Sequence, residues 1–283
     1  MEGYKGKVIL TSHSPQPQSS EDVDNIRLSF SLIKGVLKKR ILNKELDAWK
    51  KATFLMFPVE DALEPYLKED LLRAYKENNS SKFVYCESSI LNKPVSEALT
   101  KQELGIADNK ILVSYIGRHN NIKGYDRLKQ FASEILKNDD RFVFVIAGNE
   151  EPLKRLDHPN WIELGWINYG NKLISASDIF ILPNKETYFD LVTLEVMREG
   201  TPILMSLTGG NKYFKKYGEE FGFYLYNYGD LGEQVELFYK MAAELQEGTL
   251  KLKSKKIRKL FEDKFTIEQY IYRYSELICH ICN

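Results

Sequence analysis

The chain has 283 residues and a balanced charge, with 40 lysines and arginines against 40 aspartates and glutamates. This balance excludes the broad cationic field of a general nucleic-acid binder, and an apolar content of 43% excludes wholesale disorder. The longest apolar run, 142–147, is far short of the roughly 20 residues that a spanning helix needs, and three cysteines are too few for a disulfide scaffold. We therefore expect a cytoplasmic protein of one large domain or two modest ones.

Short runs of apolar residues, many of them β-branched or aromatic, alternate along the chain with longer segments of helical periodicity. The expected strands are 7–11, 53–57, 82–86, 111–116, 142–147, 161–164, 179–182, 203–206 and 222–225. The expected helices are 26–51, 59–78, 125–137, 169–176, 191–199, 210–217, 231–246 and 267–282. The strands are mostly apolar without alternation, which is typical of a parallel sheet covered on both faces. This order predicts an α/β fold with a doubly wound sheet.

Turn-forming residues after position 88 divide the chain into unequal parts. We expect a partial α/β domain over 1–105 with about three strands, a second domain over 106–265 with about six, and a C-terminal helix within 266–283 that packs back across both. The stretch 14–20 is biased to Ser, Pro and Gln, and it predicts a flexible loop.

The first candidate site is the turn that follows the expected strand 111–116. Two glycines, Gly117 and Gly124, and two cations, Arg118 and Lys123, lie in this turn. Glycines allow close backbone approach, and arginine can bind two phosphate oxygens at once. The carboxyl end of a buried strand is also where open α/β sheets bind ligands. The pattern indicates an anion site, with a surface turn of solvated cations as the alternative.

The second candidate site is the polar loop that follows strand 179–182 and the helix that it enters. Asp190 is a natural N-cap for that helix, and Gly200 is a good C′ residue. Glu195 shares a helix face with Leu191 and Arg198. A carboxylate in this position can accept two hydrogen bonds from a ribose diol. The alternative is a solvated helix glutamate.

The third candidate site is a pair of glycines, Gly209 and Gly210, which follows strand 203–206 and opens a helical segment. Backbone N–H groups at such a turn can form an anion-binding nest. Taken alone, a Gly-Gly pair is weak support for a site.

Taken in order, these segments resemble the donor half of the GT-B glycosyltransferases, specifically the retaining nucleotide-sugar transferases of family 4, glycosyl transferases group 1. The resemblance extends over residues 110–215 and depends on the order of several short motifs. It implies a GT-B-like α/β fold with a complete C-terminal Rossmann-like donor domain and a shortened N-terminal α/β domain. The motifs are Gly117-Arg118, Lys123-Gly124, a strand ending at Gly148, Leu164-Gly165-Trp166, Ser177-Asp178, Glu195, Gly200-Thr201-Pro202 and Gly209-Gly210.

The resemblance implies a glycosyltransferase that uses a UDP- or GDP-linked sugar as co-substrate and needs no metal and no further cofactor. In that family, Arg118 and Lys123 would hold the diphosphate and stabilise the leaving nucleoside diphosphate, and Glu195 would bind the ribose. The N-terminus of helix 191–199 would face the phosphates or the sugar. The other donor-binding residues implied are Gly117, Phe189, Asp190, Leu191, Gly209 and Gly210.

Two positions depart from the family pattern. The residue eight positions before Glu195 is Thr187 rather than Glu, and Glu186 lies one position too early. The contact to the donor sugar is therefore Thr187, or Glu186 reached through a shifted loop. Asp190 stands where the family usually has glycine, so the donor sugar is open.

The N-terminal part resembles the family less closely. A strand over 7–11 followed by His13 is similar to the family's strand that ends in a histidine beside the donor sugar, which would make His13 catalytic; a turn histidine in a loop is the alternative. About a hundred residues that begin family members have no counterpart here. The chain is then a fragment, a separately encoded part, or a form with a remodelled acceptor side.

Residues 32–51 form a basic amphipathic helix, which could lie on the inner face of an anionic membrane; a solvated basic face over a packed stripe is the alternative. We expect sugar transfer, with retention, to a glycan or lipid-linked acceptor in the synthesis of cell-surface polysaccharide or glycoconjugates. The rivals are a nucleotide-sugar 2-epimerase of the same fold and a non-catalytic partner or remnant of a split transferase. A partner chain or a homodimer is part of this expectation, and nucleic acid is not.

Overall fold

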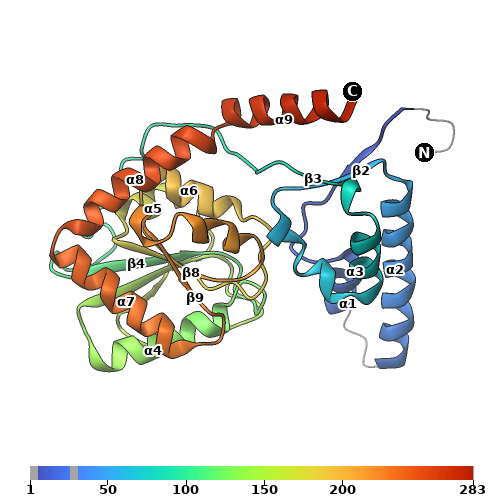
Figure 1. Ribbon diagram of the computed structural model, residues 1–283. Coiled ribbons are helices and arrows are strands. Elements are labelled where there is room, and N and C mark those ends of the chain that lie inside the picture. The colour runs from blue at the N-terminus through green and yellow to red at the C-terminus, as the bar shows by residue number, and fades with distance from the viewer. Residues whose placement is uncertain (1–5, 26–30, 283) are drawn as a thin grey trace.

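The computed structural model describes residues 6–25 and 31–282. The chain forms two parallel sheets with helices around each, and the two lobes lie side by side (Figure 1). The α/β fold class predicted from the sequence is confirmed. None of the helices in the described ranges combines the length and the apolar content that crossing a bilayer requires.

The smaller lobe contains a three-stranded parallel sheet in the order β1-β2-β3. Its strands are β1 (Ile9–Thr11), β2 (Phe54–Phe57) and β3 (Phe83–Tyr85). Its helices are α1 (Gln18–Asn25), α2 (Ser31–Lys51) and α3 (Asp70–Asn78), with short 3₁₀ helices η1 (Glu60–Leu63), η2 (Tyr66–Lys68) and η3 (Ser80–Lys82). Trp49 of α2 anchors this lobe through edge contacts with Phe57 and Phe83.

The larger lobe contains a six-stranded parallel sheet in the order β6-β5-β4-β7-β8-β9. Its strands are β4 (Ile111–Ile116), β5 (Phe142–Ala147), β6 (Trp161–Glu163), β7 (Ile179–Leu182), β8 (Ile203–Ser206) and β9 (Phe223–Tyr226). Its helices are α4 (Tyr125–Asn138), α5 (Gly170–Ala176), α6 (Leu191–Glu199), α7 (Leu231–Gln246) and α8 (Thr249–Lys264). The strand order reverses between β4 and β7, which makes the sheet doubly wound.

Both faces of the larger sheet are buried under helices (Figure 1). On the face covered by α4 and α7, Phe238 of α7 packs against Phe131 and Phe142 with ring centroids 5.1 and 4.7 Å apart. The other face lies under α5, α6 and α8, where Leu194 and Phe261 are fully buried. Coverage on both faces explains why the strands of this sheet carry few polar residues.

The structure corrects the predicted elements of the smaller lobe. The stretch 14–20 is not entirely a loop, because α1 begins at Gln18. The single helix expected over 59–78 is three pieces, η1, η2 and α3. Pro65 lies between η1 and η2, where its missing N–H and its fixed φ interrupt a helix.

Two predictions for the larger lobe also need correction. No helix was expected over 249–264, where the structure has α8, a lysine-rich helix that buries Leu250, Ile257 and Phe261. The helix expected over 210–217 is a 3₁₀ helix, η4 (Gly209–Lys216).

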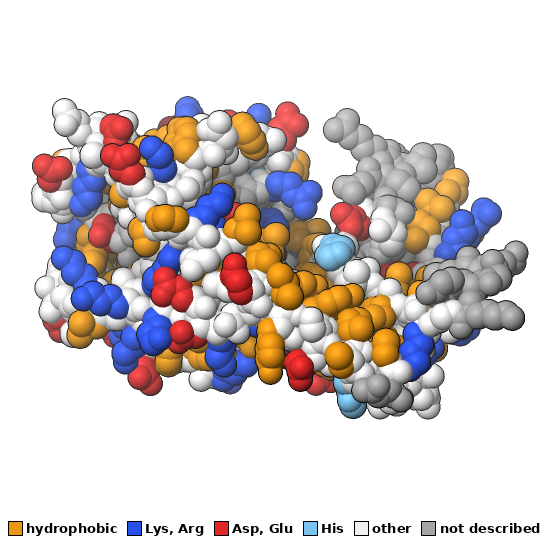
Figure 2. All heavy atoms as spheres, turned by 90° about the horizontal axis from the view of Figure 1, so that it is seen from above, with side chains coloured by type: hydrophobic (Ala, Val, Ile, Leu, Met, Phe, Trp, Pro, Cys, Tyr) orange, Lys and Arg blue, Asp and Glu red, His pale blue; other side chains and the backbone are white. Residues whose placement is uncertain are grey.

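The last helix, α9 (Ile267–Cys282), runs from α8 toward the smaller lobe (Figure 1). Arg273 pairs with Glu87 at 3.2 Å, and Lys7 donates a hydrogen bond to the carbonyl of Ile281. Figure 2 views the molecule from the α9 side and shows apolar side chains gathered over the middle of this face. Ile271 and Tyr272 of α9 are exposed.

We predict that Glu45 makes the smaller lobe less stable as the pH rises. Its carboxylate accepts hydrogen bonds from the backbone at Gln18 and Ser19, where α1 begins, and burial raises the pKa of Glu45 from 4.5 to about 7. The unfolded chain therefore releases this proton at lower pH than the folded chain does. The free energy of unfolding should fall between about pH 4.5 and about pH 7 and level off above that.

Urea unfolding at several pH values measures how steeply the free energy of unfolding falls with pH. Glu45→Gln should reduce this slope, because an amide keeps the burial without the titration. Glu77→Gln, at an exposed position on α3, is the matched control. An unchanged slope in Glu45→Gln would contradict the prediction.

Candidate functional site

The candidate site lies at the point where the strand order of the larger sheet reverses, between β4 and β7. Open α/β sheets bind ligands in the crevice outside the carboxyl ends of the strands at this point. The loop after β4 (117–124) and the loop after β7 (183–190) meet there. The N–H groups of Lys185 and Glu186 donate to the carbonyl of Ile122 at 2.9 and 3.4 Å. The structure thus brings the first two candidate segments together.

Glycines make this close approach of backbones possible. A Cβ on Gly124, whose φ is +67°, would lie 1.7 Å from the carbonyl oxygen of Pro183. A Cβ on Gly148 at the end of β5 would lie 2.0 Å from the carbonyl oxygen of Gly117. No larger residue fits either position without movement of the backbone, so these glycines fix the shape of the crevice.

Arg118 presents an exposed guanidinium that forms no hydrogen bond or ion pair with the described residues. Its backbone is held, because its carbonyl accepts hydrogen bonds from the Tyr115 hydroxyl at 3.0 Å and from the Asn120 N–H at 2.9 Å. Arg118 lines a cavity of about 240 Å³ together with Gly148 and Trp166. The Trp166 side chain is largely exposed. A fixed backbone under a free guanidinium suits the binding of an anion.

Lys123 is paired across the two loops. Its Nζ lies 2.7 Å from Oδ2 of Asp190, and the Asn184 amide donates to the same oxygen. Asp190 is the N-cap residue of α6, as predicted, but its side chain makes no capping hydrogen bond. Only the Asp190 carbonyl bonds to the helix, accepting from the Thr193 N–H at 3.0 Å. The carboxylate binds Lys123 instead, because an ammonium group within reach is a stronger partner than a backbone amide.

The start of α6 faces the same crevice. Leu191 is exposed there, whereas the Phe189 ring is buried against Phe214 and Phe265 in the core. The Phe189 side chain therefore supports the loop from behind and does not face the crevice. Glu195 is half-buried, and burial raises the pKa of its carboxyl group, with Arg198 opposing that shift. Arg198 itself is buried against Glu199 at 3.0 Å.

The structure separates the two residues that compete for the contact to a sugar. Thr187 is fully buried, and its hydroxyl lies 3.2 Å from that of Thr208. The Glu186 carboxylate points away from the core and pairs with Lys68 of the smaller lobe at 2.7 Å. Of the two side chains, only that of Glu186 faces the space between the lobes.

The Gly209-Gly210 turn already holds an anionic group. The Gly209 N–H donates to Oε2 of Glu64 at 2.6 Å, and Lys212 lies 3.0 Å from the same oxygen. A Cβ on Gly210 would lie 1.9 Å from the carbonyl oxygen of Tyr188, so this turn packs directly on the loop after β7. The contact with Glu64 was not foreseen from the sequence, because the two residues are 145 positions apart.

His13 is exposed at the carboxyl end of β1. The carbonyl of its neighbour Ser12 accepts a hydrogen bond from the Tyr188 hydroxyl, so this end of the small sheet touches the loop after β7. No described contact joins the His13 ring to Arg118 or Lys123. Its catalytic role stays a prediction.

A buried cluster behind Arg118 was also missed. His119 is fully buried and stacks on Tyr125 with centroids 3.9 Å apart; neither of its ring nitrogens has a hydrogen-bond partner among the described residues. Burial lowers the pKa of His119 and raises that of Glu163, 3.7 Å away. Its position directly after Gly117-Arg118 was the available signal. We infer that a neutral ring packed under this loop helps to keep Arg118 in place.

Three lysines around the crevice are neutralised by carboxylates, whereas Arg118 forms no ion pair with the described residues. In the described residues, no three His, Cys, Asp or Glu side chains come close enough together to hold a metal ion. The charge that an incoming anion would meet is that of Arg118 and of lysines that can change partner. The paired lysines are Lys123 with Asp190, Lys68 with Glu186 and Lys212 with Glu64.

Comparison with known proteins finds relatives of the larger lobe. Residues 110–241 match the family model of glycosyl transferases group 1. The chain is 32% identical over 149 residues to a glycogen synthase of Petrotoga mobilis, a match that covers 47% of this chain and 30% of that protein. It is 25% identical over 190 residues to the Escherichia coli UDP-Gal:alpha-D-GlcNAc-diphosphoundecaprenol alpha-1,3-galactosyltransferase, covering 63% of this chain and 48% of that protein. The matches thus span less than half the length of these curated relatives.

Solved structures extend the likeness to both lobes. Anabaena HepE in complex with UDP-glucose has a TM-score of 0.71 at 13% identity and covers 97% of this chain and 72% of its own. The sucrose-phosphate synthase of Thermosynechococcus elongatus has a TM-score of 0.70 at 17% identity and covers 99% of this chain and 69% of its own. At such identities the likeness shows the fold alone. The predicted GT-B architecture and the resemblance to glycosyl transferases group 1 are confirmed.

We predict that Gly148→Ala costs more stability than Gly165→Ala. Both glycines have positive φ, but a Cβ on Gly148 meets the Gly117 carbonyl whereas one on Gly165 meets nothing within 4 Å. Gly165→Ala should cost about 1–2 kcal/mol through backbone strain, and Gly148→Ala at least about 3 kcal/mol because the loop after β4 must also move. Denaturant unfolding of both variants measures the difference. Equal losses would show that this close approach is not enforced.

Proposed function

We propose that the protein, whose residues 110–241 match the family model of glycosyl transferases group 1, transfers a sugar from a nucleoside diphosphate sugar to a glycan or a lipid-linked acceptor. The observation that carries this proposal is the guanidinium of Arg118, which has no partner among the described residues and lies at the carboxyl end of β4, where the strand order reverses. A cation, a helix N-terminus and loops whose backbones approach closely form a site that suits a diphosphate.

Each part of the donor has a complementary region. The diphosphate binds between Arg118 and Lys123, and the free N–H groups at the start of α6 face it. The cavity of about 240 Å³ beside Trp166 accepts the base of a uridine or guanosine diphosphate, and the half-buried Glu195 accepts hydrogen bonds from the ribose. We assign the sugar contact to Glu186, because the Thr187 side chain is buried against Thr208.

We further propose that the transfer proceeds with retention and without a metal. The bond between the anomeric carbon and the leaving phosphate breaks, and a bond from that carbon to the acceptor oxygen forms on the same face. The acceptor proton passes to the leaving phosphate, so no side chain acts as nucleophile. Arg118, Lys123 and the N-terminus of α6 stabilise the charge that develops on that phosphate, which is the work a metal ion does in other transferases.

A cytoplasmic role in cell-surface polysaccharide or glycoconjugate synthesis is part of this proposal. It is supported by the similarity to the Escherichia coli enzyme whose name specifies a diphosphoundecaprenol-linked acceptor. Because the chain spans less than half of that relative, the acceptor itself is left to experiment.

A non-catalytic nucleotide-sugar-binding partner of a split transferase is the second candidate. Two observations favour it: the Gly209 N–H already donates to Glu64, and Lys123 is already paired with Asp190. Both contacts must yield before a donor can use those groups. A protein that binds the donor but neither hydrolyses nor transfers it until a second chain is added would support this candidate.

We predict that Arg118→Ala and Lys123→Ala each weaken nucleoside diphosphate binding about tenfold to a hundredfold, the loss of one charged hydrogen bond, while the fold survives. Thermal unfolding against UDP, GDP and their sugar conjugates measures this, since a ligand at 100 times its Kd adds about 2.7 kcal/mol. Lys137→Ala, a cation with an exposed side chain on α4, is the control. Wild-type affinity in both variants would overturn the donor site.

We propose also that α2 contacts an anionic membrane surface. Ile33 and Val36 are exposed on this helix, as are Lys39 and Arg40. Sedimentation with vesicles containing phosphatidylglycerol should pull down the wild type, and the double variant Val36→Asp and Lys39→Glu should bind less because it loses apolar contact and charge attraction together. Equal binding of the variant, or of the wild type to neutral vesicles, would count against this contact.

A further inference from the structure

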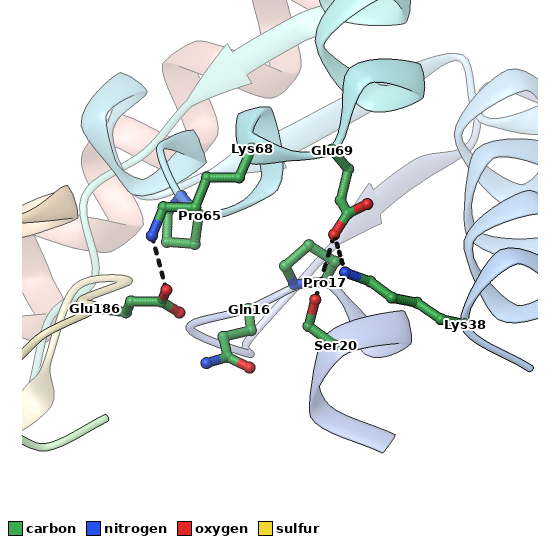
Figure 3. Close-up of a pocket in the computed structure, with 8 residues that line it drawn as sticks. All are labelled: Gln16, Pro17, Ser20, Lys38, Pro65, Lys68, Glu69 and Glu186. Atoms are coloured by element: carbon green, nitrogen blue, oxygen red, sulfur yellow. Dashed lines mark hydrogen bonds and ion pairs between the residues drawn. The ribbon is translucent and has the colours of Figure 1, made fainter. Parts of the chain in front are cut away.

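Two of the cavities in the structure differ in how their polar groups are paired. The larger, of about 380 Å³, lies between the two lobes, and the lysines on its wall are paired with carboxylates: Lys38 with Glu69, and Lys68 with Glu186 (Figure 3). These charges cancel, so this wall does not require a charged ligand. The smaller cavity lies within the larger lobe, and several of its polar groups lack partners.

The smaller cavity has a volume of about 10 Å³ and lies at the carboxyl end of β9. Its wall comes from the start of α4, the end of β9 and the first turn of α7, and it includes Arg127, Tyr226 and Gln234. Gln130, which is exposed, also lines it, so the cavity is reached from solvent there. Such a volume holds one particle of about the size of a water molecule. A nucleotide or a sugar is too large for it.

Three hydrogen-bonding groups of this wall have no partner among the described residues. They are Nε of Arg127, the hydroxyl of Tyr226 and Nε2 of Gln234. Tyr226 and Gln234 are 2% and 3% exposed, so bulk water does not solvate them. Buried polar groups of this kind cost free energy unless a ligand supplies the missing partner.

We propose that this cavity, here called the β9 cavity, binds a single halide ion such as chloride. Arg127, Tyr226 and Gln234 each donate one hydrogen bond to the ion, which thereby joins α4, β9 and α7. The proposal is independent of the proposed function, because it assigns a second site with a ligand of its own.

The chemistry of the three groups selects an anion over water. Nε of Arg127 and Nε2 of Gln234 can only donate hydrogen bonds. Burial raises the pKa of Tyr226, so its hydroxyl keeps a proton that it can donate as well. A water molecule accepts at most two of these three hydrogen bonds, and its own two protons then require acceptors that the three groups do not supply. A halide ion accepts all three and has no proton to place.

Arg127 also supplies the charge that an anion needs. Its Nη1 donates to Oε1 of Gln130 at 3.0 Å, and its Cζ lies 5.7 Å from the centre of the Tyr228 ring. Both of these partners are neutral, and Arg127 forms no ion pair with the described residues. Asp126 precedes it in the chain but neither lines the cavity nor pairs with it. A half-buried guanidinium with neutral partners is stabilised by an anion beside it.

A halide in the β9 cavity should stabilise the larger lobe. Thermal unfolding of the full chain in sodium chloride and in sodium gluconate tests this. Gluconate carries the same charge but is too large for the cavity, so at equal ionic strength the two salts screen surface charges alike. We expect the midpoint of unfolding to rise with chloride concentration, to saturate, and to exceed the midpoint in gluconate by about 3 °C or more.

Variants of the wall show whether this response arises in the β9 cavity. Gln234→Glu places a carboxylate beside Arg127, in the position of the ion, and should abolish the chloride response. Tyr226→Phe removes one donor and keeps the ring, so it should weaken chloride binding about tenfold. Gln246→Leu, at the exposed end of α7, is the matched control and should respond as the wild type does.

Equal midpoints of the wild type in the two salts would overturn the halide site. A full chloride response in both Gln234→Glu and Tyr226→Phe would also overturn it, because the response would then arise elsewhere. Crystals grown in sodium bromide give a direct readout: anomalous scattering should show one bromide ion beside Nε2 of Gln234, and a water molecule in its place would contradict the proposal. None of these results depends on nucleotide binding or on sugar transfer.

Discussion

The contact between the loop after β4 and the loop after β7 is the constraint on which the ligand-facing edge of the larger lobe depends. The order of this parallel sheet reverses between these strands, so the connections that leave their carboxyl ends run to opposite faces of the sheet and leave a crevice between them. The carbonyl of Ile122 then binds the amides of Lys185 and Glu186, and Gly124 lies directly on the carbonyl of Pro183. Backbone contacts of this kind leave little freedom, so the side chains that depend on these loops are held in fixed positions.

Charge pairing determines which ligand could use that crevice. Lys123 already pairs with the Asp190 carboxylate, which also accepts a hydrogen bond from the Asn184 amide. Lys212 and the Gly209 N–H both bind the Glu64 carboxylate. A singly charged anion gains little by replacing such partners, because it only repeats what the carboxylate offered. A diphosphate carries more charge and spans the distance to a helix N-terminus as well, so it can compete where a carboxylate is already bound.

The features that the sequence could predict are those fixed by local pattern. The strands β4, β5, β7 and β8 were placed at their observed bounds because each is an apolar run bounded by turn residues. The glycine-rich turns were found for the same reason. Pro65 also carried a local signal, the interruption of the helix expected over 59–78, although the prediction did not use it.

The remaining features depend on contacts between distant residues. The side chain of Asp190 leaves the helix end because Lys123, 67 positions earlier, reaches it. Which of Glu186 and Thr187 faces the space between the lobes depends on how the loop after β7 packs against Thr208. The spacing of residues along the sequence does not determine that packing. Similarly, nothing in the local sequence distinguishes Glu64 and Glu45 from exposed glutamates. Only the fold brings Glu64 to the Gly209 N–H and Glu45 to the backbone at the start of α1.

Glu64 and Lys68 connect the lobes through the very groups that a ligand would contact, the Gly209 amide and the Glu186 carboxylate. The smaller lobe is therefore an internal competitor whose effective concentration is set by the covalent linker between β3 and β4. A ligand that replaces either contact weakens the association of the two lobes. By thermodynamic reciprocity, any change that weakens the association of the lobes raises the affinity for that ligand by the same factor. Length and stiffness of the linker thus become determinants of affinity, although no linker residue need touch the ligand.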